Sequence, residues 1–473
     1  MIALRLDEIA RAVDGVLHAG DPAAVVRGAV ETDSRELRPG GVFIARRGEA
    51  MDGHDFAPAA LEAGAALLIV ERPLEVAVPQ IVVGDATAAM GRLAHEVVER
   101  VRAAGRLRVV GVTGSNGKTT TKNLLLEILS RIGPTVASRA SFNNEVGGPH
   151  TMLRVQEDTA FLVAEMGASA IGEIARLVAL AKPDVGVVLK VGLAHAGGFG
   201  GIEGTVAAKS EMVTSLTEHD VAVLNRDDPR VAGMAERTRA RVAWFGLDAD
   251  PAAGGTAARD VVADSAGTRF VLELPTGERR DVRFRVLGEH HVGNALAAAA
   301  VSSALGVDAD TVVAGLEAVV RAERWRMEVL ATDPVTVVND AYNASPDSMA
   351  AALKALVQIA QSDGRRSVAV LGAMAELGEQ AGEEHDRIGL LAVRLNIGQL
   401  VVVGPEARRM HLSASAEGSW DGESLYAESI EDAEALLADL VRPGDTVLVK
   451  ASNAAGLRGL GDRLGARWAE AGR

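Results

Sequence analysis

The residues best suited to chemistry lie closest together between Val110 and Thr120, where the sequence reads VGVTGSNGKTT. The apolar run RLRVV leads into this segment, and the helix-like run TKNLLLEILSRIG follows it. A strand, a glycine-rich turn and a helix in this order form a cradle for phosphate, because backbone N–H groups at the helix N-terminus face the anion. The pattern predicts a nucleotide-binding loop made by Gly114, Ser115, Asn116, Gly117, Lys118, Thr119 and Thr120.

The loop is a shortened variant of the pattern G-x-x-x-x-G-K-[ST], because Val112 stands where the first glycine belongs. We expect Lys118 to lie against the terminal phosphates and the Thr119 hydroxyl to bind the accompanying magnesium ion. An ordinary Gly-Ser-Asn turn is the alternative, and the strand before and the helix after it argue against that reading. Apolar residues at helical spacing predict the buried face of the helix: Leu124, Leu125, Ile128, Leu129 and Ile132.

Two further polar residues follow predicted strands. Glu165 stands at the end of the run TAFLVAEM, and His195 follows the run DVGVVLKVGLA. Because ligands of parallel sheets gather at the carboxyl ends of strands, we expect both residues at the same edge as the phosphate loop. With Thr119 they could hold a divalent metal beside the γ-phosphate. On position alone, Glu165 could equally cap a helix or face solvent, and His195 could be structural.

Five more positions have roles that the residues alone leave open. Lys209 in TVAAKSEM is most simply a solvated helix lysine, and Asn294 in GEHHVGNALAAAAV is either an early-helix polar residue or a reader of a base. Asp340 in VVNDAYNASPDSM follows a predicted strand, where it is ordinarily a turn former. Arg324 and Arg326 are either surface charges or phosphate contacts across a domain boundary.

The elements that position these residues belong to a chain of 473 residues, a length that favours about three domains. The absence of cysteine excludes disulfides and thiolate metal sites and fits a reducing compartment. The first residues, MIALRLDEIARAVDG, do not resemble a signal peptide, and no apolar run reaches membrane-spanning length. We therefore expect a soluble, cytoplasmic protein without membrane insertion.

The formal net charge of −15 argues against binding to nucleic acid, which depends on clustered Lys and Arg. Aromatic residues make up 3% of the chain, too few for an obvious base-stacking surface. A small phosphorylated ligand in a locally positive pocket remains compatible with this composition.

The hydrophobic pattern predicts an α/β fold with three domains. Residues 1–83 contain the strand-like runs GVFIA and ALLIV and the helix-like segment FAPAALEAGA. Residues 84–321 alternate strands and helices as in a parallel sheet, and the turn-rich residues 251–285 predict an antiparallel extension. Residues 322–473 resume the alternation with VTVVND, SVAVLGAM, QLVVVG and DTVLVKAS, which predicts a Rossmann-like domain.

Taken in order, the motifs resemble one family over essentially the whole chain. TGSNGKTT, SFNNEVGGP, AEMGA, AAKSEM, NRDDP, GEHHVGNALAA, NDAYNASPDSM and VLGAMAELGE are similar to segments of the Mur ligases, ATP-dependent amide-forming enzymes of peptidoglycan precursor synthesis. DAYNASPDSM, MAELGE, SFNNEVGGP and the N-terminal ETDSRELRPGGVFIARRGEAMDGHDF most resemble members that join D-alanyl-D-alanine to UDP-N-acetylmuramoyl-tripeptide. The last of these segments is similar to the uridine-nucleotide-binding domain shared by the two later ligases. The Asp-Asn-Pro-Arg motif of the diaminopimelate-adding members is absent, which favours this subtype.

The resemblance implies a two-step reaction. A substrate carboxylate attacks the γ-phosphate of ATP, and the amine of the dipeptide then displaces phosphate from the acyl phosphate. Lys118, His195 and Lys209 are the implied catalytic residues. Two magnesium ions are implied, with Thr119, Glu165, His195 and Lys209 at the metals and Lys209 carried as a carbamate, which requires a neutral amine first.

The resemblance also implies binding roles for residues far apart in the chain. Asn294 would meet adenine, and Arg326 and Asp340 would complete the ATP site when the third domain closes. The implied substrate contacts are Ser34 and Arg35 at the UDP-sugar, together with Asn143, Asn144, Tyr342 and Asn343. We expect a monomer with UDP-N-acetylmuramoyl-tripeptide and D-alanyl-D-alanine as its substrates.

Three positions depart from the family pattern and leave third-domain contacts and amino-acid selectivity open: Ser345, Ala373 and Asn453. One alternative is another ligase of the superfamily, such as a folylpolyglutamate synthetase or an amino-acid-adding Mur relative, although the N-terminal domain and the YNAS motif argue against it. Another is a nucleotide-binding regulator with an inactive ligase site, which would not need the intact residues Lys118, Thr119, Glu165, His195 and Lys209.

Overall fold

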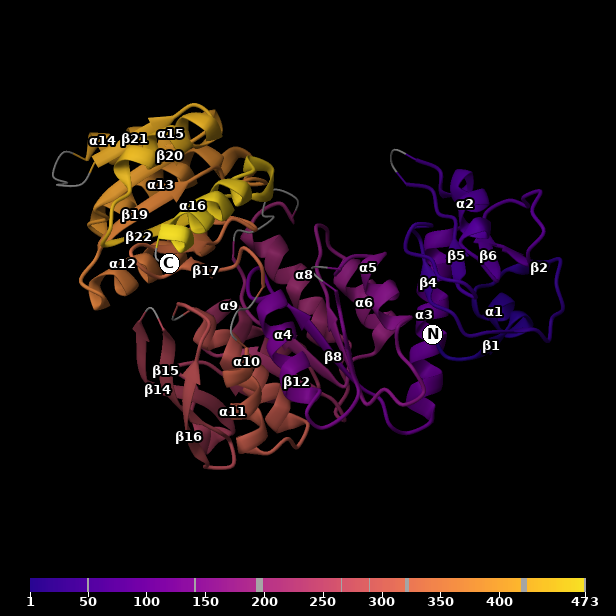
Figure 1. The fold of residues 1–473 in the computed structure, drawn as a ribbon. Coiled ribbons are helices and arrows are strands. Elements are labelled where there is room, and N and C mark those ends of the chain that lie inside the picture. Colours follow the sequence, from indigo (N-terminus) through magenta and orange to yellow (C-terminus); the bar gives the residue numbers. More distant parts are fainter. Residues whose placement is uncertain are drawn as a thin grey trace.

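The computed structural model describes residues 1–48, 51–139, 142–192, 199–264, 266–288, 290–319, 323–417 and 423–471. Figure 1 shows three units in chain order, with the N-terminal unit in indigo, the central unit in purple to red and the C-terminal unit in orange and yellow. Each unit is built on its own sheet. The expected boundary between residues 321 and 322 lies outside the described residues.

The N-terminal unit has a five-stranded sheet in the order β2-β7-β6-β5-β4, with β2 antiparallel to β7 and the other pairs parallel. A short antiparallel pair, β1 (Leu4–Arg5) and β3 (Val25–Val26), lies outside this sheet. The expected strands of GVFIA and ALLIV and the helix after Phe56 are confirmed. The bounds are β2 (Val16–His18), β4 (Val30–Glu31), β5 (Val42–Ile44), β6 (Leu67–Val70), β7 (Gln80–Val82), α1 (Leu6–Ala12) and α2 (Ala57–Glu62).

The central unit has a nine-stranded sheet in the order β16-β15-β14-β13-β12-β11-β8-β10-β9. Strands β8 to β13 pair in parallel, and β14, β15 and β16 form the expected antiparallel extension. The strands are β8 (Arg108–Thr113), β9 (Thr135–Ala137), β10 (Phe161–Glu165), β11 (Val185–Val188), β12 (Val221–Asn225), β13 (Arg241–Phe245), β14 (Gly255–Asp264), β15 (Gly267–Glu273) and β16 (Arg279–Phe284). The helices are α3 (Ala86–Ala103), α4 (Lys118–Leu129), α5 (Gly147–Met152), α6 (Glu173–Ala181), α8 (Ile202–Thr214), α9 (Pro229–Ala232), α10 (His290–Ala304) and α11 (Ala309–Ala318).

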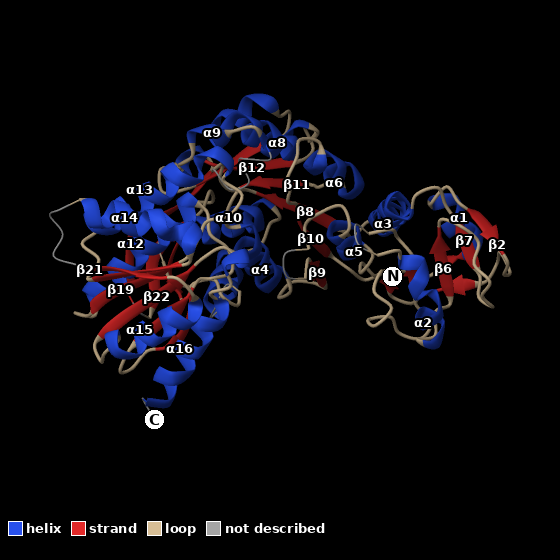
Figure 2. Cartoon of the chain, turned by 90° about the horizontal axis from the view of Figure 1, so that it is seen from above, coloured by secondary structure: helices blue, strands red, loops and turns tan. Residues whose placement is uncertain are grey.

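The C-terminal unit has a six-stranded sheet in the order β17-β18-β22-β19-β20-β21, in which only the β17 pairing is antiparallel among the described strands. Figure 2 shows helices on both sides of these red strands, as in a doubly wound fold. The strands are β17 (Glu328–Ala331), β18 (Thr336–Asn339), β19 (Arg366–Leu371), β20 (Gln399–Val403), β21 (Glu423–Ala427) and β22 (Asp445–Lys450). The helices are α12 (Pro346–Ser362), α13 (Ala381–Arg394), α14 (Arg408–Ala416), α15 (Ile430–Leu440) and α16 (Arg458–Ala471).

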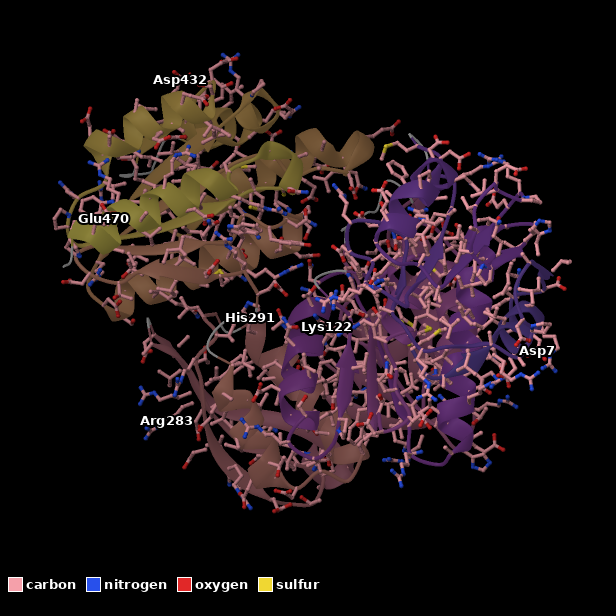
Figure 3. The ribbon with its side chains drawn as sticks, turned by 45° about the vertical axis from the view of Figure 1, so that its right-hand side comes forward. Asp7, Lys122, Arg283, His291, Asp432 and Glu470 are labelled. Carbon is pink, nitrogen blue, oxygen red and sulfur yellow. The ribbon has the colours of Figure 1, made fainter. Side chains whose placement is uncertain are left out.

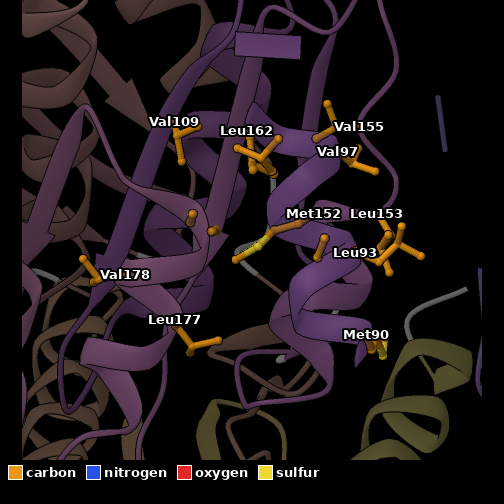
Figure 4. Packing of buried hydrophobic residues seen from close by; sticks show 14 of the residues in the cluster. Met90, Leu93, Val97, Val109, Met152, Leu153, Val155, Leu162, Leu177 and Val178 are labelled. Carbon is orange, nitrogen blue, oxygen red and sulfur yellow. The ribbon is translucent and has the colours of Figure 1, made fainter. Parts of the chain in front are cut away.

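One hydrophobic core joins the N-terminal and central units. Helix α3 packs against α1 on one side and against α5 and α6 on the other. Figure 4 shows Met90, Leu93 and Val97 of α3 beside Met152 and Leu153, and all five belong to the same buried cluster. Helix α3 thereby fixes one unit to the other, because close-packed interiors resist displacement.

One sequence expectation about the core is wrong. Ile132 was expected on the buried face of α4, but the helix ends at Leu129 and Ile132 is 46% exposed. The chain turns there, with the N–H groups of Ile132 and Gly133 both donating to the Leu129 carbonyl. Among the described residues, no helix has both the length and the apolar composition needed to cross a bilayer.

Candidate active site

The phosphate loop joins β8 to α4, as the sequence predicts. Gly114 has φ 155° and Gly117 has φ 87°, a left-handed conformation that side chains disfavour. A Cβ at Gly117 would also lie 2.2 Å from Oδ1 of Asn294, so the position requires glycine. The Nζ of Lys118 donates to the Gly114 carbonyl at 2.6 Å, which holds the lysine across the loop. Thr119 and Thr120 are buried behind it.

Burial lowers the pKa of the Lys118 ammonium, and the Glu165 carboxylate opposes that effect. An amine held in such surroundings gains from a nearby anion, because the anion restores the stability of its charged form. The loop is therefore suited to a phosphate group.

The loop forms one wall of a cavity of about 370 Å³. The opposite wall comes from the C-terminal unit and includes Arg326, Asp340, Tyr342 and Asn343. The two walls touch through long contacts, with Arg326 Nη2 3.4 Å from Thr119 Oγ1 and Ser345 Oγ 3.4 Å from Asn116 Oδ1. The structure thus brings together loop and C-terminal residues that the sequence assigned to one site.

Glu165 lies at the carboxyl end of β10, in register with Val112 of β8, and is 1% exposed. Its Oε1 accepts a hydrogen bond from Asn143 Nδ2 at 2.8 Å. Its Oε2 is buried and has no hydrogen-bond partner within the described part of the chain. A buried carboxylate oxygen left in this state, in a cavity that Thr119 and the phosphate loop also line, would suit a magnesium ion. His195 lies outside the described residues.

Lys209 is buried in α8 at 2% exposure, so the reading as a solvated helix lysine is wrong. Its ammonium lies 5.4 Å from the centroid of the Phe199 ring. Burial, and secondarily the charge of Lys118, lower the pKa of Lys209 to about 7. A substantial neutral fraction near pH 7 follows, which is the form that could react with carbon dioxide.

Asn294 contacts the start of α4, next to the phosphate loop. Its Nδ2 donates to Nδ1 of His291 at 3.1 Å, and its Oδ1 accepts from the Thr121 hydroxyl at 3.5 Å. His291 is buried and lines the same cavity, and Figure 3 shows it and Lys122 near the junction with the C-terminal ribbon. A role of Asn294 at adenine stays a prediction.

The C-terminal wall is held by buried charge. Asp340 Oδ2 pairs with Lys450 Nζ at 2.7 Å, and its Oδ1 accepts the Met327 N–H at 3.0 Å. Arg324 is exposed and pairs with Asp462 at 3.1 Å, which matches the surface-charge reading rather than a phosphate contact. Asn453, one of the departures from the family pattern, is exposed.

Sequence reasoning missed several residues in or beside this site, among them Lys190, His291 and Lys450 of the cavity lining and Lys122 on α4. Lys122 is buried, donates to the Ser138 carbonyl at 2.8 Å and has its pKa lowered by burial. Its spacing of four from Lys118 on one helix could have drawn attention to it. Lys450 at the carboxyl end of β22 could have been found by the strand-end argument that selected Glu165.

A second cavity, of about 840 Å³, adjoins the first and shares Lys118 and Asn143 with it. Its lining comes from α3, from the residues before α5 and from the start of α6, and includes Asn144. It carries both signs of charge, with Asp85, Arg92, Glu145, Glu173 and Arg176 in the lining. It can hold a large polar ligand that reaches the phosphate loop at one end.

Ser34 and Arg35 lie in the N-terminal unit and line neither of the two cavities formed by the described residues. Arg35 is exposed and pairs with Asp33 at 2.6 Å, and these hydrogen bonds lower the pKa of Asp33 to about 2. The structure therefore does not join them to the rest of the predicted site.

Three family models match the chain in series. "Mur ligase family, catalytic domain" covers residues 28–108, "Mur ligase middle domain" covers residues 112–302, and "Mur ligase, glutamate ligase domain" covers residues 325–453.

Two similar proteins that match nearly the whole chain carry the same name. The UDP-N-acetylmuramoyl-tripeptide–D-alanyl-D-alanine ligase of Mycobacterium tuberculosis (strain H37Rv) is 43% identical over 98% of each chain, and that of Escherichia coli K12 is 34% identical over 97% of each. Among solved structures, MurF from Acinetobacter baumannii has a TM-score of 0.89 at 31% identity, covering 98% of this chain and 99% of the other. MurF ligase from Thermotoga maritima in complex with ADP has a TM-score of 0.80 at 30% identity, covering 92% and 96%. On this evidence of sequence, fold and site, the chain belongs to the Mur ligase family.

Proposed function

We propose that the chain is an ATP-dependent ligase that joins D-alanyl-D-alanine to UDP-N-acetylmuramoyl-tripeptide in peptidoglycan precursor synthesis. The relatives that match nearly its whole length are named for this reaction. The structural observation that carries the proposal is the meeting of two cavities at Lys118 and Asn143. A nucleotide in the first cavity and a peptide carboxylate in the second would react at that junction.

The reaction has two balanced steps. An oxygen of the tripeptide carboxylate bonds to the γ-phosphorus of ATP while the bond to the β–γ bridging oxygen breaks, which gives an acyl phosphate and ADP. The dipeptide amine then attacks the acyl carbon, loses a proton and expels phosphate through a tetrahedral intermediate. Phosphorylation is needed because oxide is a poor leaving group and phosphate is a good one.

In this proposal the residues of both walls neutralise charge during phosphoryl transfer. Lys118 lies across the loop, where it would meet the terminal phosphates, and Arg326 would face them from the C-terminal wall. Such fixed charges act strongly in a cavity that excludes water. Closure of the C-terminal wall also protects the acyl phosphate from hydrolysis.

Thr119 and Glu165 would hold a magnesium ion, which supplies positive charge beside the phosphate oxygens when bound. The unpartnered Oε2 of Glu165 among the described residues supports this assignment. We assign a second metal to His195 and a carbamate of Lys209, supported on the lysine side by its burial and lowered pKa. Lys118, His195 and Lys209 are the proposed catalytic residues.

The remaining roles are also proposals. Asn294 would contact adenine and Asp340 would complete the ATP site. The acceptor and dipeptide contacts would be Ser34, Arg35, Asn143, Asn144, Tyr342 and Asn343. We further propose domains of residues 1–83, 84–321 and 322–473 and a monomer that works in the cytoplasm, where ATP and UDP-sugars are made.

The test is a coupled phosphate-release assay with ATP, magnesium, UDP-N-acetylmuramoyl-tripeptide and D-alanyl-D-alanine. We expect one phosphate and one new amide bond for each ATP consumed, with the product identified by mass spectrometry. Omission of either peptide partner, or exchange of the dipeptide for L-alanine or D-glutamate, should leave only background release. Equal turnover with single amino acids would reject this substrate assignment, and absence of any ADP would reject ligase activity.

A further inference from the structure

The segment that carries Arg326 has an unusual backbone. Trp325 has φ 59° and Met327 has φ 48°, so residues with large side chains adopt the left-handed conformation on both sides of Arg326. This conformation is costly for such residues and persists only where surrounding contacts hold it. The segment is therefore held in place for a reason other than local preference.

Hydrogen bonds within the C-terminal unit hold this backbone. The Trp325 N–H donates to Glu328 Oε2 at 2.9 Å, and the Met327 N–H donates to Asp340 Oδ1 at 3.0 Å. The Tyr342 N–H donates to the Trp325 carbonyl at 3.1 Å. The position of Arg326 is thus set from both sides along the chain.

The side chains form an alternating series of rings and guanidinium groups. The Arg458 guanidinium lies 4.8 Å from the Trp325 ring centroid and 4.6 Å from that of Tyr342. The Arg326 guanidinium lies 4.1 Å from the same Tyr342 ring. Planar guanidinium groups stack on aromatic faces in a way that a lysine ammonium does not reproduce.

The outer end of the series is anchored to α16. Arg458 is its first residue and donates to the carbonyls of Tyr342 at 3.0 Å and Ala341 at 3.3 Å. Trp325 Nε1 donates to Asp462 on the same helix at 3.1 Å. Both outer members are therefore fixed by hydrogen bonds as well as by stacking.

The inner end of the series faces the phosphate loop. Arg326 Nη2 lies 3.4 Å from the Thr119 hydroxyl, and its buried Nε has no hydrogen-bond acceptor within the described part of the chain. A buried cationic donor in this state favours an anion in the adjoining cavity.

We propose that Arg458 and Trp325 are positioning residues that, through Tyr342, hold Arg326 against the phosphate chain of the nucleotide. This inference rests on the proposed ligase function. Neither residue lines the cavity, so their effect on the reaction would pass through Arg326.

A double-mutant cycle tests the proposal, with Arg458→Met, Arg326→Met and the double variant. Arg467→Met is the matched control, because Arg467 is on the same helix, is exposed and stacks on Trp468 at 5.6 Å. We expect Arg458→Met to lower kcat for ADP formation about tenfold and to cause no further loss when Arg326 is already Met. Arg458→Lys should not restore the rate, and Arg467→Met should equal the wild type.

Independent, multiplying losses in the double variant would overturn the proposal, as would full activity of Arg458→Met or Arg458→Lys.

If Arg458→Met does not fold, Trp325→Phe and Trp325→Leu replace it. The phenylalanine variant should keep most of the activity because it keeps a ring, whereas the leucine variant should lose about as much as Arg458→Met was expected to lose. Equal activity of these two variants would overturn the proposal. A wild-type protein that makes no ADP would overturn the ligase function and this inference together, whereas an active wild type with additive losses would overturn only this inference.

Discussion

The two walls of the nucleotide cavity are built in different ways. On the central wall, Lys118 reaches the Gly114 carbonyl at 2.6 Å, and the groups that hold the loop come mostly from the same sheet edge. The C-terminal wall meets this loop through contacts of 3.4 Å from Arg326 and Ser345, more than 200 residues further along the chain. The first wall is organised once the central sheet has folded, while the second depends on how the C-terminal unit is seated.

Because of this difference, we expect the central wall to bind the nucleotide and the C-terminal wall to enclose it. Short hydrogen bonds within one sheet give a phosphate site that needs no rearrangement, and preorganisation of this kind is what electrostatic catalysis requires. The long contacts that Arg326 and Ser345 make with the loop cost little to break, which under the proposed function would let the C-terminal wall open for substrate and product exchange. The following substitutions test whether the walls divide the work in this way.

The largest effect is expected for Lys118→Ala, which removes a positive charge from the phosphate loop of the central wall. We expect kcat for amide formation to fall by roughly 10³-fold, the upper range for loss of one preorganised donor. Circular dichroism should show an unchanged fold. Lys354→Ala, at an exposed position of α12, is the control and should keep full activity. Normal turnover by Lys118→Ala would refute its role.

A second test asks how rigid that wall is. In Gly117→Ala the new Cβ would displace Asn294 from its bond to His291, in addition to straining a backbone with φ 87°. We expect KM for ATP to rise about 30-fold, which corresponds to about 2 kcal/mol for strain and a lost hydrogen bond. Gly105→Ala is the matched control, because Gly105 has φ 84° and open space where a Cβ would lie. An equal KM for ATP in the two variants would show that the central wall is not rigid.

The third test concerns Lys209, a buried lysine of α8 whose pKa is lowered by burial and by the charge of Lys118. Because its pKa is lowered to about 7, the amine is mostly neutral at pH 8 and mostly protonated at pH 6. The fraction able to form a carbamate should therefore fall about tenfold as the pH falls through this range. ¹³C NMR with labelled bicarbonate should show a carbamate signal at pH 8 that weakens at pH 6 and is absent in Lys209→Arg. A signal that does not depend on pH would contradict this expectation.

The smallest effect is expected at the edge between the walls, where Asn123 Nδ2 donates to Glu323 Oε2 at 3.1 Å. Glu323→Ala should raise KM for ATP about threefold, because one partly exposed hydrogen bond is worth only about 0.5–1 kcal/mol. Glu127→Ala, which removes an exposed partner of Arg131 on α4, should leave KM unchanged. A loss as large as that of Lys118→Ala would mean that both walls are equally indispensable.

The sequence predicted the central wall better than the C-terminal wall for a physical reason. Strand, loop and helix around Lys118 are contiguous, so local patterns are enough to describe them. The stacking of Arg458 on Tyr342 joins residues 116 positions apart, and no local pattern records it. Lys209 was misjudged from composition because the burial of α8 comes from packing between elements. The end of α4 at Leu129 was also not predicted, because the helical spacing of apolar residues continues to Ile132, past the point where the chain turns.

The core shared through α3 has a consequence for the spacing of substrates. Ile44 and Ile69 of the N-terminal sheet, Met90 of α3 and Leu162 of the central sheet belong to one buried cluster. The two clusters of the C-terminal sheet contain, apart from Leu287, only residues from Met327 onward. Under the proposed function, the binding site for the uridine end of the acceptor and the binding site for ATP lie on two units that share one hydrophobic core. Folding then sets the distance between these two sites and therefore the length of acceptor that can span them. Only the C-terminal unit would adjust its position to the acceptor.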